Sequence, residues 1–473
     1  MNNSAGGDRR EPSSFRDNRG FVFWRGGEAY RAISEVGVAD YDLLMSSGLY
    51  EELTGAGLLV THAELDAGAA GAVTADGEAG AAGARVIKPA MVPFVSYPYE
   101  WSFSQLQDAA LATLEIQRLA VACGLTLRDA SAYNIQFVEG RPVMIDTLSF
   151  GKLTADEPWV AYRQFCQHFL APLALMSTRG FELQQLLRTY IDGLPLALAA
   201  RLLPARAKWR PGLATHISLH AGYQKRHQST AARPVARVSD TSRAALVDSL
   251  ARTVRGLRAP VSDTEWGDYY RHTNYVDEAF ESKKRLVDEA LARTGAKVVA
   301  DLGANDGSFS RVAAAGGAHV LSCDIDPIAV EKNYRQAREA KETTILPLLI
   351  DLTNPSADLG WANSERASFT SRVAAQTDAI LALAIIHHLA ISNNLPLGHI
   401  AEYFAGLAPW LIIEFVPKSD SQVKILLATR EDIFPEYTAT GLETAFGKRY
   451  EIIDRLSVAD SERTVYLMKR RSS

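Results

Sequence analysis

The sequence predicts an α/β protein whose C-terminal half is a doubly wound, Rossmann-like sheet of seven strands, preceded by an α+β domain. Three observations predict this sheet. Short apolar runs alternate with helical stretches from residue 298 onward, which is typical of parallel βαβ units. The first run leads into a glycine-containing turn and a helix. Several runs end in an acidic residue, and the carboxyl ends of parallel strands form the ligand-binding edge of such sheets.

The first strand is Val298–Ala300, and a turn with the sequence Asp301-Leu-Gly303-Ala-Asn305-Asp-Gly307 follows it. Glycines in such a turn let the backbone approach a ligand closely. The spacing differs from G-x-G-x-x-G, and no Lys-Ser/Thr follows, which disfavours a phosphate-binding P-loop. An acid at the end of the strand suits a ligand with a cationic amino group better than a pyrophosphate.

The next two apolar runs, 319–326 and 346–352, also end in acids. Asp324, with Asp326 as the second choice, can accept hydrogen bonds from ribose hydroxyls, and Asp351 from the amino group of adenine. A single Asp at a strand end is more often a helix cap or a turn residue. The ordered set of acids and glycines nevertheless resembles motif I and the following strands of class I S-adenosylmethionine (SAM)-dependent methyltransferases. This resemblance implies that SAM is the cofactor.

Aromatic residues precede the first strand by about one helix. In the family that the motif resembles, such residues often form a lid over the cofactor. Tyr270 and Tyr275 are therefore candidate cofactor contacts, together with Trp266 and Tyr269. The alternative is that they pack against the following amphipathic helix, on which Lys283 is expected on the charged side.

The fourth and fifth strands lie within 377–389 and 411–417 and border the expected acceptor site. Amino-methylating enzymes of this family often carry Asp/Asn-Pro-Pro-Tyr after the fourth strand, whereas this chain has Ile-His387-His388-Leu. We therefore expect an oxygen or carbon acceptor. His387 or His388 is the candidate base because histidine titrates near neutral pH, with Glu414 as a weaker candidate. Alternatively, one histidine packs against the sheet and the other lines the pocket.

The N-terminal half begins with two short strands around Gly26-Gly27, and a strong helix covers 104–123. Arg128-Asp129 and Asn134 match the pattern Arg-Asp-x-x-x-x-Asn, and Asp146 ends an apolar strand. These features resemble the catalytic core of protein kinases and aminoglycoside-type phosphotransferases. The resemblance implies Asp129 as the base, Asn134 and Asp146 as magnesium ligands, and Mg²⁺ with ATP as cofactors.

The pattern departs from that family at several points. No His precedes Arg128, Asp146 is followed by Thr-Leu instead of Phe-Gly, and no glycine-rich phosphate loop is evident. The phosphate-binding cation is either Lys88 or Arg31. Two interpretations remain: a phosphotransferase-like domain, or a structural or substrate-presenting domain whose loop acids satisfy backbone donors. The missing phosphate-binding elements favour the second.

Composition limits the other function classes. The chain has 473 residues, 47% hydrophobic and 22% charged, with a formal net charge of −5, which gives no basic field for nucleic acid. Its three cysteines, Cys123, Cys166 and Cys323, form neither a disulfide framework nor a zinc pattern, so we expect a cytoplasmic protein. The apolar stretch 194–203 contains Arg201 and is too short to span a membrane, and we expect no secretory signal.

We expect four segments: a disordered tail (1–20), a kinase-like or substrate-presenting domain (21–225, with a flexible insertion at 66–83), a connector (226–263) and a SAM-dependent methyltransferase domain (264–473). The whole chain resembles a family of two-part bacterial methyltransferases that includes nodulation-associated proteins. The matching stretches are 128–150, 158–175, 301–307, 385–389 and 414–434.

That resemblance implies methyl transfer from SAM to a small molecule or a carrier-bound metabolite. One alternative is a bifunctional phosphotransferase-methyltransferase. Another is a methyltransferase whose N-terminal domain is a non-catalytic binding module for a macromolecular partner.

Overall fold

The computed structural model describes residues 9–65, 85–155, 157–219, 239–260, 277–428 and 430–472. The chain forms two compact units. Unit 1 comprises Met1–Tyr99, Phe103–Pro260 and Asp358–Arg366, and unit 2 comprises Glu100–Ser102, Val261–Ala357 and Ala367–Ser473. Within the described ranges, no helix is long and apolar enough to cross a lipid bilayer.

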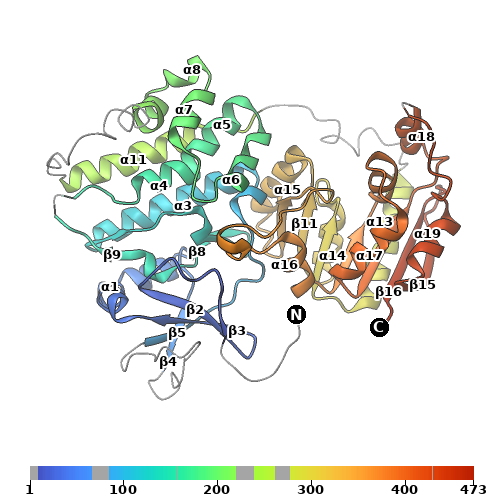
Figure 1. Ribbon diagram of the computed structural model, residues 1–473, viewed down its shortest axis with the longest axis horizontal. Helices are drawn as coiled ribbons and strands as arrows, with labels where there is room; N and C mark the ends of the chain where they lie inside the picture. The colour runs from blue at the N-terminus through green and yellow to red at the C-terminus, as the bar shows by residue number, and fades with distance from the viewer. Residues whose placement is uncertain are drawn as a thin grey trace. The chain divides into compact units, whose positions relative to one another are not determined.

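Unit 2 contains the predicted seven-stranded sheet (Figure 1). Its strands, in spatial order, are β12 (Ile345–Leu349), β11 (His319–Asp324), β10 (Val298–Leu302), β13 (Ala379–Ala382), β14 (Trp410–Phe415), β16 (Thr464–Arg470) and β15 (Tyr450–Ser457). The first five are parallel, and β16 pairs antiparallel with both β14 and β15. The strand order reverses between β10 and β13, and a ligand crevice is expected at that point.

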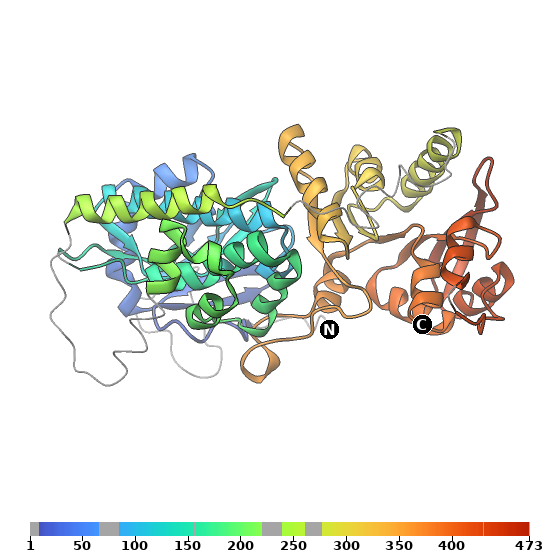
Figure 2. The ribbon, with the colours of Figure 1, turned by 90° about the horizontal axis from the view of Figure 1, so that it is seen from above.

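Two groups of helices cover the two faces of this sheet, as Figure 2 shows. One group is α13 (Asp277–Thr294), α14 (Ser308–Ala315) and α15 (Pro327–Ala340); the other is α16 (Phe369–Gln376), α17 (Leu397–Leu407) and α19 (Ala439–Phe446). The short helix α18 (Ser421–Ala428) follows β14. Val287, Val299, Phe309 and Leu467 are buried in the core between the sheet and the first group.

Unit 1 contains a five-stranded antiparallel sheet. Its strands, in spatial order, are β1 (Arg9–Arg10), β2 (Gly20–Arg25), β3 (Glu28–Ile33), β5 (Arg85–Pro89) and β4 (His62–Leu65). Gly26 and Gly27 both have positive φ in the β2–β3 turn, which confirms the predicted hairpin. The helices α1 (Glu35–Ser46) and α2 (Leu49–Gly55) follow β3.

The tail expected at residues 1–20 is partly ordered, which corrects the prediction for residues 9–20. Strand β1 pairs with β2, and the Ser14 hydroxyl accepts a hydrogen bond from the backbone N–H of Val22. Backbone pairing of this kind does not need an apolar sequence, so composition alone did not indicate it. The insertion expected at 66–83 lies outside the described residues.

The remainder of unit 1 contains two small strand pairs and a set of helices. Strand β6 (Leu125–Leu127) pairs with β9 (Phe150–Lys152), and β7 (Ile135–Val138) pairs with β8 (Arg141–Met144). The α-helices are α3 (Phe103–Ala122), α4 (Tyr162–Phe165), α5 (Ala171–Arg179), α6 (Leu186–Thr189), α7 (Leu196–Leu202), α8 (Ala205–Lys208), α9 (Pro211–Leu213) and α11 (Asp240–Gly256). Helix α11 lies where the sequence suggested a connector, and it packs against α3 within unit 1.

Candidate active site

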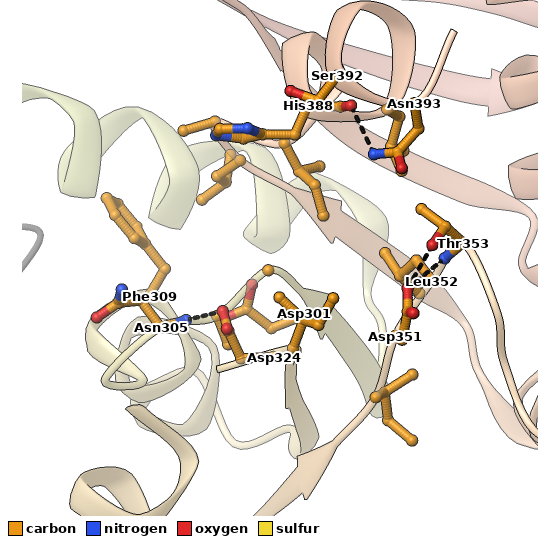
Figure 3. Close-up of a pocket in the computed structure, with 18 of the residues that line it drawn as sticks. Asp301, Asn305, Phe309, Asp324, Asp351, Leu352, Thr353, His388, Ser392 and Asn393 are labelled. Carbon is orange, nitrogen blue, oxygen red and sulfur yellow. Dashed lines mark hydrogen bonds between the residues drawn. The ribbon is translucent and has the colours of Figure 1, made fainter. Parts of the chain in front are cut away.

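A pocket of about 360 Å³ opens at the carboxyl ends of the parallel strands of unit 2. Acidic residues from three successive strands line one part of it: Asp301, Asp324 and Asp351. The histidine loop after β13 contributes His388, Leu389, Ser392 and Asn393. Figure 3 shows His388 and Asn393 across the pocket from Asp301 and Asp324. The pocket thus has an acidic side and a separate side that carries an imidazole.

The turn after β10 has the backbone conformation that its sequence predicts. Gly303 has φ 86°, and a Cβ at this position would lie 2.9 Å from Cδ1 of Ile385. Asn305 has φ 49°, in the left-handed region that Asn tolerates better than most residues. Gly307, with φ 81°, precedes α14, where a Cβ would lie 2.5 Å from the side chain of Asn333. Gly303 and Asn305 line the pocket, whereas Gly307 lets α14 begin close to α15.

Asp301 lies at the floor of the pocket and is almost fully buried. Its Oδ2 accepts a hydrogen bond from the Ser310 hydroxyl at 2.6 Å. Burial raises the pKa of Asp301 to about 7, and the Ser310 hydrogen bond opposes that rise. A buried carboxyl with a raised pKa is stabilised in its ionised form when a cation binds beside it.

The two acids at the end of β11 have different environments. Asp324 lines the pocket, and its carboxylate accepts the backbone N–H of Asn305 at 2.7 Å and that of Asp326 at 2.8 Å. Burial raises the pKa of Asp324 to about 6. Asp326 instead caps α15 by accepting the N–H of Ile328 at 2.9 Å. Asp324 is therefore the acid of this pair that lines the pocket.

Asp351 follows β12 by two residues and lines the pocket. Its Oδ1 accepts the backbone N–H of Thr353 at 2.8 Å and the Thr353 hydroxyl at 2.6 Å. This Asx turn fixes the carboxyl group at the edge of the pocket. Tyr270 and Tyr275, the other two candidate cofactor contacts, lie outside the described residues, as do Trp266 and Tyr269.

The two histidines differ in their access to the pocket. His388 lines it and begins a π-helical turn, η8 (His388–Ser392), whereas His387 is fully buried behind it. Their ring centroids are 4.1 Å apart. Burial lowers the pKa of His388 to about 4 and lowers that of His387 well below its usual value. Both rings are therefore neutral at pH 7. Among the described residues, neither ring nitrogen of His387 has a hydrogen-bond partner.

Two basic residues that the sequence analysis did not identify as site residues also line the pocket: Lys283 and Arg463. Lys283 Nζ lies 2.6 Å from Glu414 Oε2, and Arg463 Nη1 lies 3.6 Å from Glu414 Oε1. Glu414 is fully buried, so the expected weaker base forms an ion pair with Lys283. Lys283 was expected among exposed charges on its helix, and its burial corrects that expectation. The sequence does contain a signal for this burial. Lys283 lies three residues after Phe280 and four before Val287, so it shares the helix face of these apolar residues.

The candidate residues of unit 1 lie in the loops between its small strand pairs. Asp129 and Asn134 lie between β6 and β7, and Asp146 follows β8. Asp146 accepts the N–H of Leu148 at 3.0 Å and the Ser149 hydroxyl at 2.7 Å, and it forms an ion pair with Arg31. Ser149 also accepts a hydrogen bond from Asn134 Nδ2 at 3.2 Å.

Asp129 accepts the N–H of Ser131 at 2.8 Å, and burial raises its pKa. In the part of the chain that the structure describes, no group of three or more His, Cys, Asp or Glu side chains could hold a metal ion. The acids of these loops thus satisfy backbone donors, and they also lie in one connected polar cluster.

The strand order of unit 2, its antiparallel β16, and the acid-and-glycine turn facing a pocket define a class I SAM-dependent methyltransferase. Comparison with known proteins identifies the family. The chain is 35% identical over 394 residues to nodulation protein NoeA of Rhizobium meliloti (strain 1021), and the match covers 82% of each chain. The chain belongs to the NoeA family, which confirms the resemblance to nodulation-associated proteins. No protein-family model matches the chain.

Solved structures with some similarity include three methyltransferases. The bifunctional kinase-methyltransferase WbdD is 16% identical over 41% of this chain and 40% of its own, with a TM-score of 0.27. Magnesium protoporphyrin IX methyltransferase (ChlM) from Synechocystis PCC 6803 with bound SAM is 17% identical over 45% of this chain and 100% of its own, with a TM-score of 0.30. N-methyltransferase NodS from Bradyrhizobium japonicum WM9 is 10% identical over 41% of this chain and 98% of its own, with a TM-score of 0.31. These scores are low, and the chain matches only about two fifths of the length of WbdD.

Proposed function

We propose that this protein transfers the methyl group of SAM to an oxygen or carbon atom of a small molecule or a carrier-bound metabolite. The observation that carries this proposal is the placement of His388 across one pocket from Asp301 and Asp324. When bound, SAM supplies an electrophilic methyl group on a sulfonium. In the proposal, Asp301 binds its amino group, Asp324 its ribose hydroxyls and Asp351 its adenine amino group.

The histidine loop supports an oxygen or carbon acceptor over an amine. It provides a neutral imidazole, and its Leu389, together with Leu426 of α18, gives the pocket apolar walls. With a pKa of about 4, His388 is a weak base. It is therefore suited to orient an acidic acceptor, such as a phenol, an enol or a carboxylate. Where the acceptor oxygen or carbon still carries its proton, a ring nitrogen of His388 receives that proton as the methyl group is transferred.

Labelled methyl transfer tests the proposal. The full-length chain is incubated with SAM labelled in its methyl group and a small-molecule extract of the organism that makes it. We expect labelled products that are methyl ethers, esters or C-methyl compounds. Label found only on nitrogen would overturn the acceptor class, and an absence of SAM binding in calorimetry would overturn the proposal itself.

A second candidate function, phosphotransfer by unit 1, has one specific observation in its favour. Arg31 on β3 forms an ion pair with Asp146, so a cation from the five-stranded sheet reaches the acid that follows β8. This ion pair supports Arg31 over Lys88 as the phosphate-binding cation of such a phosphotransferase. Lys88 instead pairs with Glu28 at the surface.

Magnesium fits this cluster only in part. Asn134 and Asp146 offer one amide and one carboxylate, which leaves most of an octahedral shell to phosphate and water, as is common for Mg²⁺ in nucleotide sites. In unit 1 the Arg31 guanidinium contacts Asp146 and would have to move aside for the metal. We therefore keep the non-catalytic binding module as the preferred function of unit 1.

Thermal unfolding of the full chain separates the two functions of unit 1. Phosphotransfer requires a shift with ATP and Mg²⁺ that is lost in Asp146→Asn. Unchanged unfolding with saturating ATP and Mg²⁺ would overturn phosphotransfer and leave the binding module.

A further inference from the structure

Lys283 is a buried cation at the wall of the candidate SAM site. It belongs to α13, its side chain is 4% exposed, and it lines the pocket. Its Nζ lies 2.6 Å from Glu414 Oε2 and 4.6 Å from the centre of the Phe309 ring. Burial lowers the pKa of Lys283, and the charge of Glu414 opposes that effect. Holding an ammonium group in this place costs desolvation energy, which suggests a binding role.

The charges around the pocket leave one group of SAM to be assigned. Three carboxyl groups line it, those of Asp301, Asp324 and Asp351. They suit the amino group, the ribose and the adenine of SAM, but they repel its α-carboxylate. Among the described lining residues, Lys283 and Arg463 carry positive charge. Of the described lining residues, these two offer a carboxylate that enters the pocket a compensating positive charge.

The positions of the two cations favour Lys283. Arg463 is held between two carboxylates, with its Nε 2.8 Å from Asp420 Oδ2 and its Nη1 3.6 Å from Glu414. Lys283 Nζ lies over Phe309, the residue that precedes Ser310 in α14, and Ser310 donates to Asp301. Lys283 and Asp301 therefore both contact the first turn of α14, and the charge of each acts on the pKa of the other. The α-amino and α-carboxylate groups of SAM share one carbon atom, so their partners must also be neighbours.

We propose that Lys283 binds the α-carboxylate of SAM, with Glu414 as the buried counter-ion that keeps Lys283 charged and in place. This inference rests on the proposed function. It gives Glu414 a positioning role in place of the base role expected from the sequence, because a carboxylate between Lys283 and Arg463 is a poor proton acceptor.

Two ligands that differ only in the carboxylate test this assignment: SAM and decarboxylated SAM. Calorimetry on the full-length protein should show SAM binding roughly tenfold or more tightly, as expected for a charge-assisted hydrogen bond. In Lys283→Gln, the affinity for SAM should fall by about the same factor, and the affinity for decarboxylated SAM should be nearly unchanged. The affinity gap between the two ligands should therefore close. Lys284→Gln is the matched control: Lys284 is the next residue and pairs with Glu281, and it should keep the gap.

Folding defects are separated from recognition by a second variant. Lys283→Gln leaves Glu414 buried beside Arg463, so the double variant K283Q/E414Q removes both members of the pair and leaves no buried unpaired charge. The affinity gap is the ratio of two affinities measured on the same protein sample, so it does not depend on how much of that sample is correctly folded. It should be closed in the double variant also.

The remaining outcomes identify which idea fails. Equal weakening of both ligands in Lys283→Gln would overturn the carboxylate assignment and leave the SAM site intact. Unchanged affinity for both ligands, with a raised KM for the acceptor, would also overturn it and would place Lys283 in the acceptor site. If the wild-type protein bound neither ligand, the proposed function would fall as well.

Discussion

Asp324 accepts the backbone N–H of Asn305 at 2.7 Å, and this bond ties the turn after β10 to the end of β11. The bond holds the turn against the neighbouring strand, with the Asp324 carboxyl group at the wall of the pocket. The same carboxylate accepts the N–H of Asp326, so its position is fixed before any ligand binds. A preorganised carboxylate loses little conformational entropy when it binds a ligand.

Asp301→Asn should weaken SAM binding and remove part of its pH dependence, and the ionisation of Asp324 should account for the rest. The pKa of Asp301 is raised to about 7 and that of Asp324 to about 6, so both carboxyls ionise as pH rises from 5.5 to 7.5. Affinity for a cationic ligand should rise over this range in the wild type. Calorimetry at several pH values measures it. Asp288→Asn, at an exposed position of α13, is the control and should behave as wild type.

The same substitution should stabilise the ligand-free protein at high pH. The folded pKa of Asp301, about 7, lies above its unfolded value, so the unfolded state ionises first and stability falls as pH rises from about 4 to 7. Asp301→Asn removes this loss, with a gain on the order of 4 kcal/mol at pH 8 and little gain at pH 4. Denaturation at both pH values measures the difference. Equal stability of the two proteins at pH 8 would contradict the raised pKa.

His388→Asn should lower kcat and leave SAM affinity nearly unchanged, because His388 lies across the pocket from the acids. With a pKa of about 4, the wild-type His388 ring stays neutral above pH 5. The dependence of kcat on pH should therefore show no ionisation of His388 between pH 5 and 8. His387→Asn should instead mainly lower the unfolding temperature, since His387 is fully buried. A steep change of kcat near pH 6.5 that is absent in His388→Asn would contradict this account.

The sheet and its acids were predictable from the sequence because strands, glycine turns and strand-end acids are local patterns. The prediction placed Gly303 and Asn305 beside the pocket, and it ranked Asp324 above Asp326. That ranking has a physical basis in the structure, where Asp326 is used as the cap of α15.

Lys283 and Arg463 were missed because their burial depends on distant partners. Lys283 pairs with Glu414, 131 residues away, and its helix neighbours Glu281, Lys284 and Arg285 suggested a solvated face. No local sequence pattern predicts an ion pair between residues so far apart in the chain. The order of residues 9–20 was missed for the same reason, since β1 is stabilised by hydrogen bonds to β2.

Arg372→Ala should strongly destabilise unit 2. Arg372 forms a two-pronged ion pair with Glu100, and both side chains are nearly fully buried. Removing the arginine leaves a buried carboxylate without its ion-pair partner, and such a loss typically costs about 3–5 kcal/mol. Hydrogen exchange of peptides from β11 and β12 measures the effect. Arg449→Ala, which breaks an exposed pair with Glu402, should change exchange little.

Asn393 should position the histidine loop through its side-chain amide. Its Nδ2 donates to the carbonyl oxygen of His388 at 2.9 Å, and its backbone N–H donates to the same oxygen at 3.1 Å, which closes the π-helical turn η8. Such turns often occur at functional sites. Asn393→Ala should therefore lower kcat about tenfold without weakening SAM binding, a loss of the size expected for one hydrogen bond that orients an active-site group.

The isosteric variant Asn393→Asp separates this role from packing. A carboxylate fills the same space but cannot donate to the His388 carbonyl and is repelled by it, so its kcat should fall at least as far as that of Asn393→Ala. Steady-state kinetics with the identified acceptor, together with SAM calorimetry, measure both effects. Wild-type kcat in Asn393→Asp would show that the side chain only fills space, and a parallel loss of SAM affinity would show that the whole pocket has collapsed.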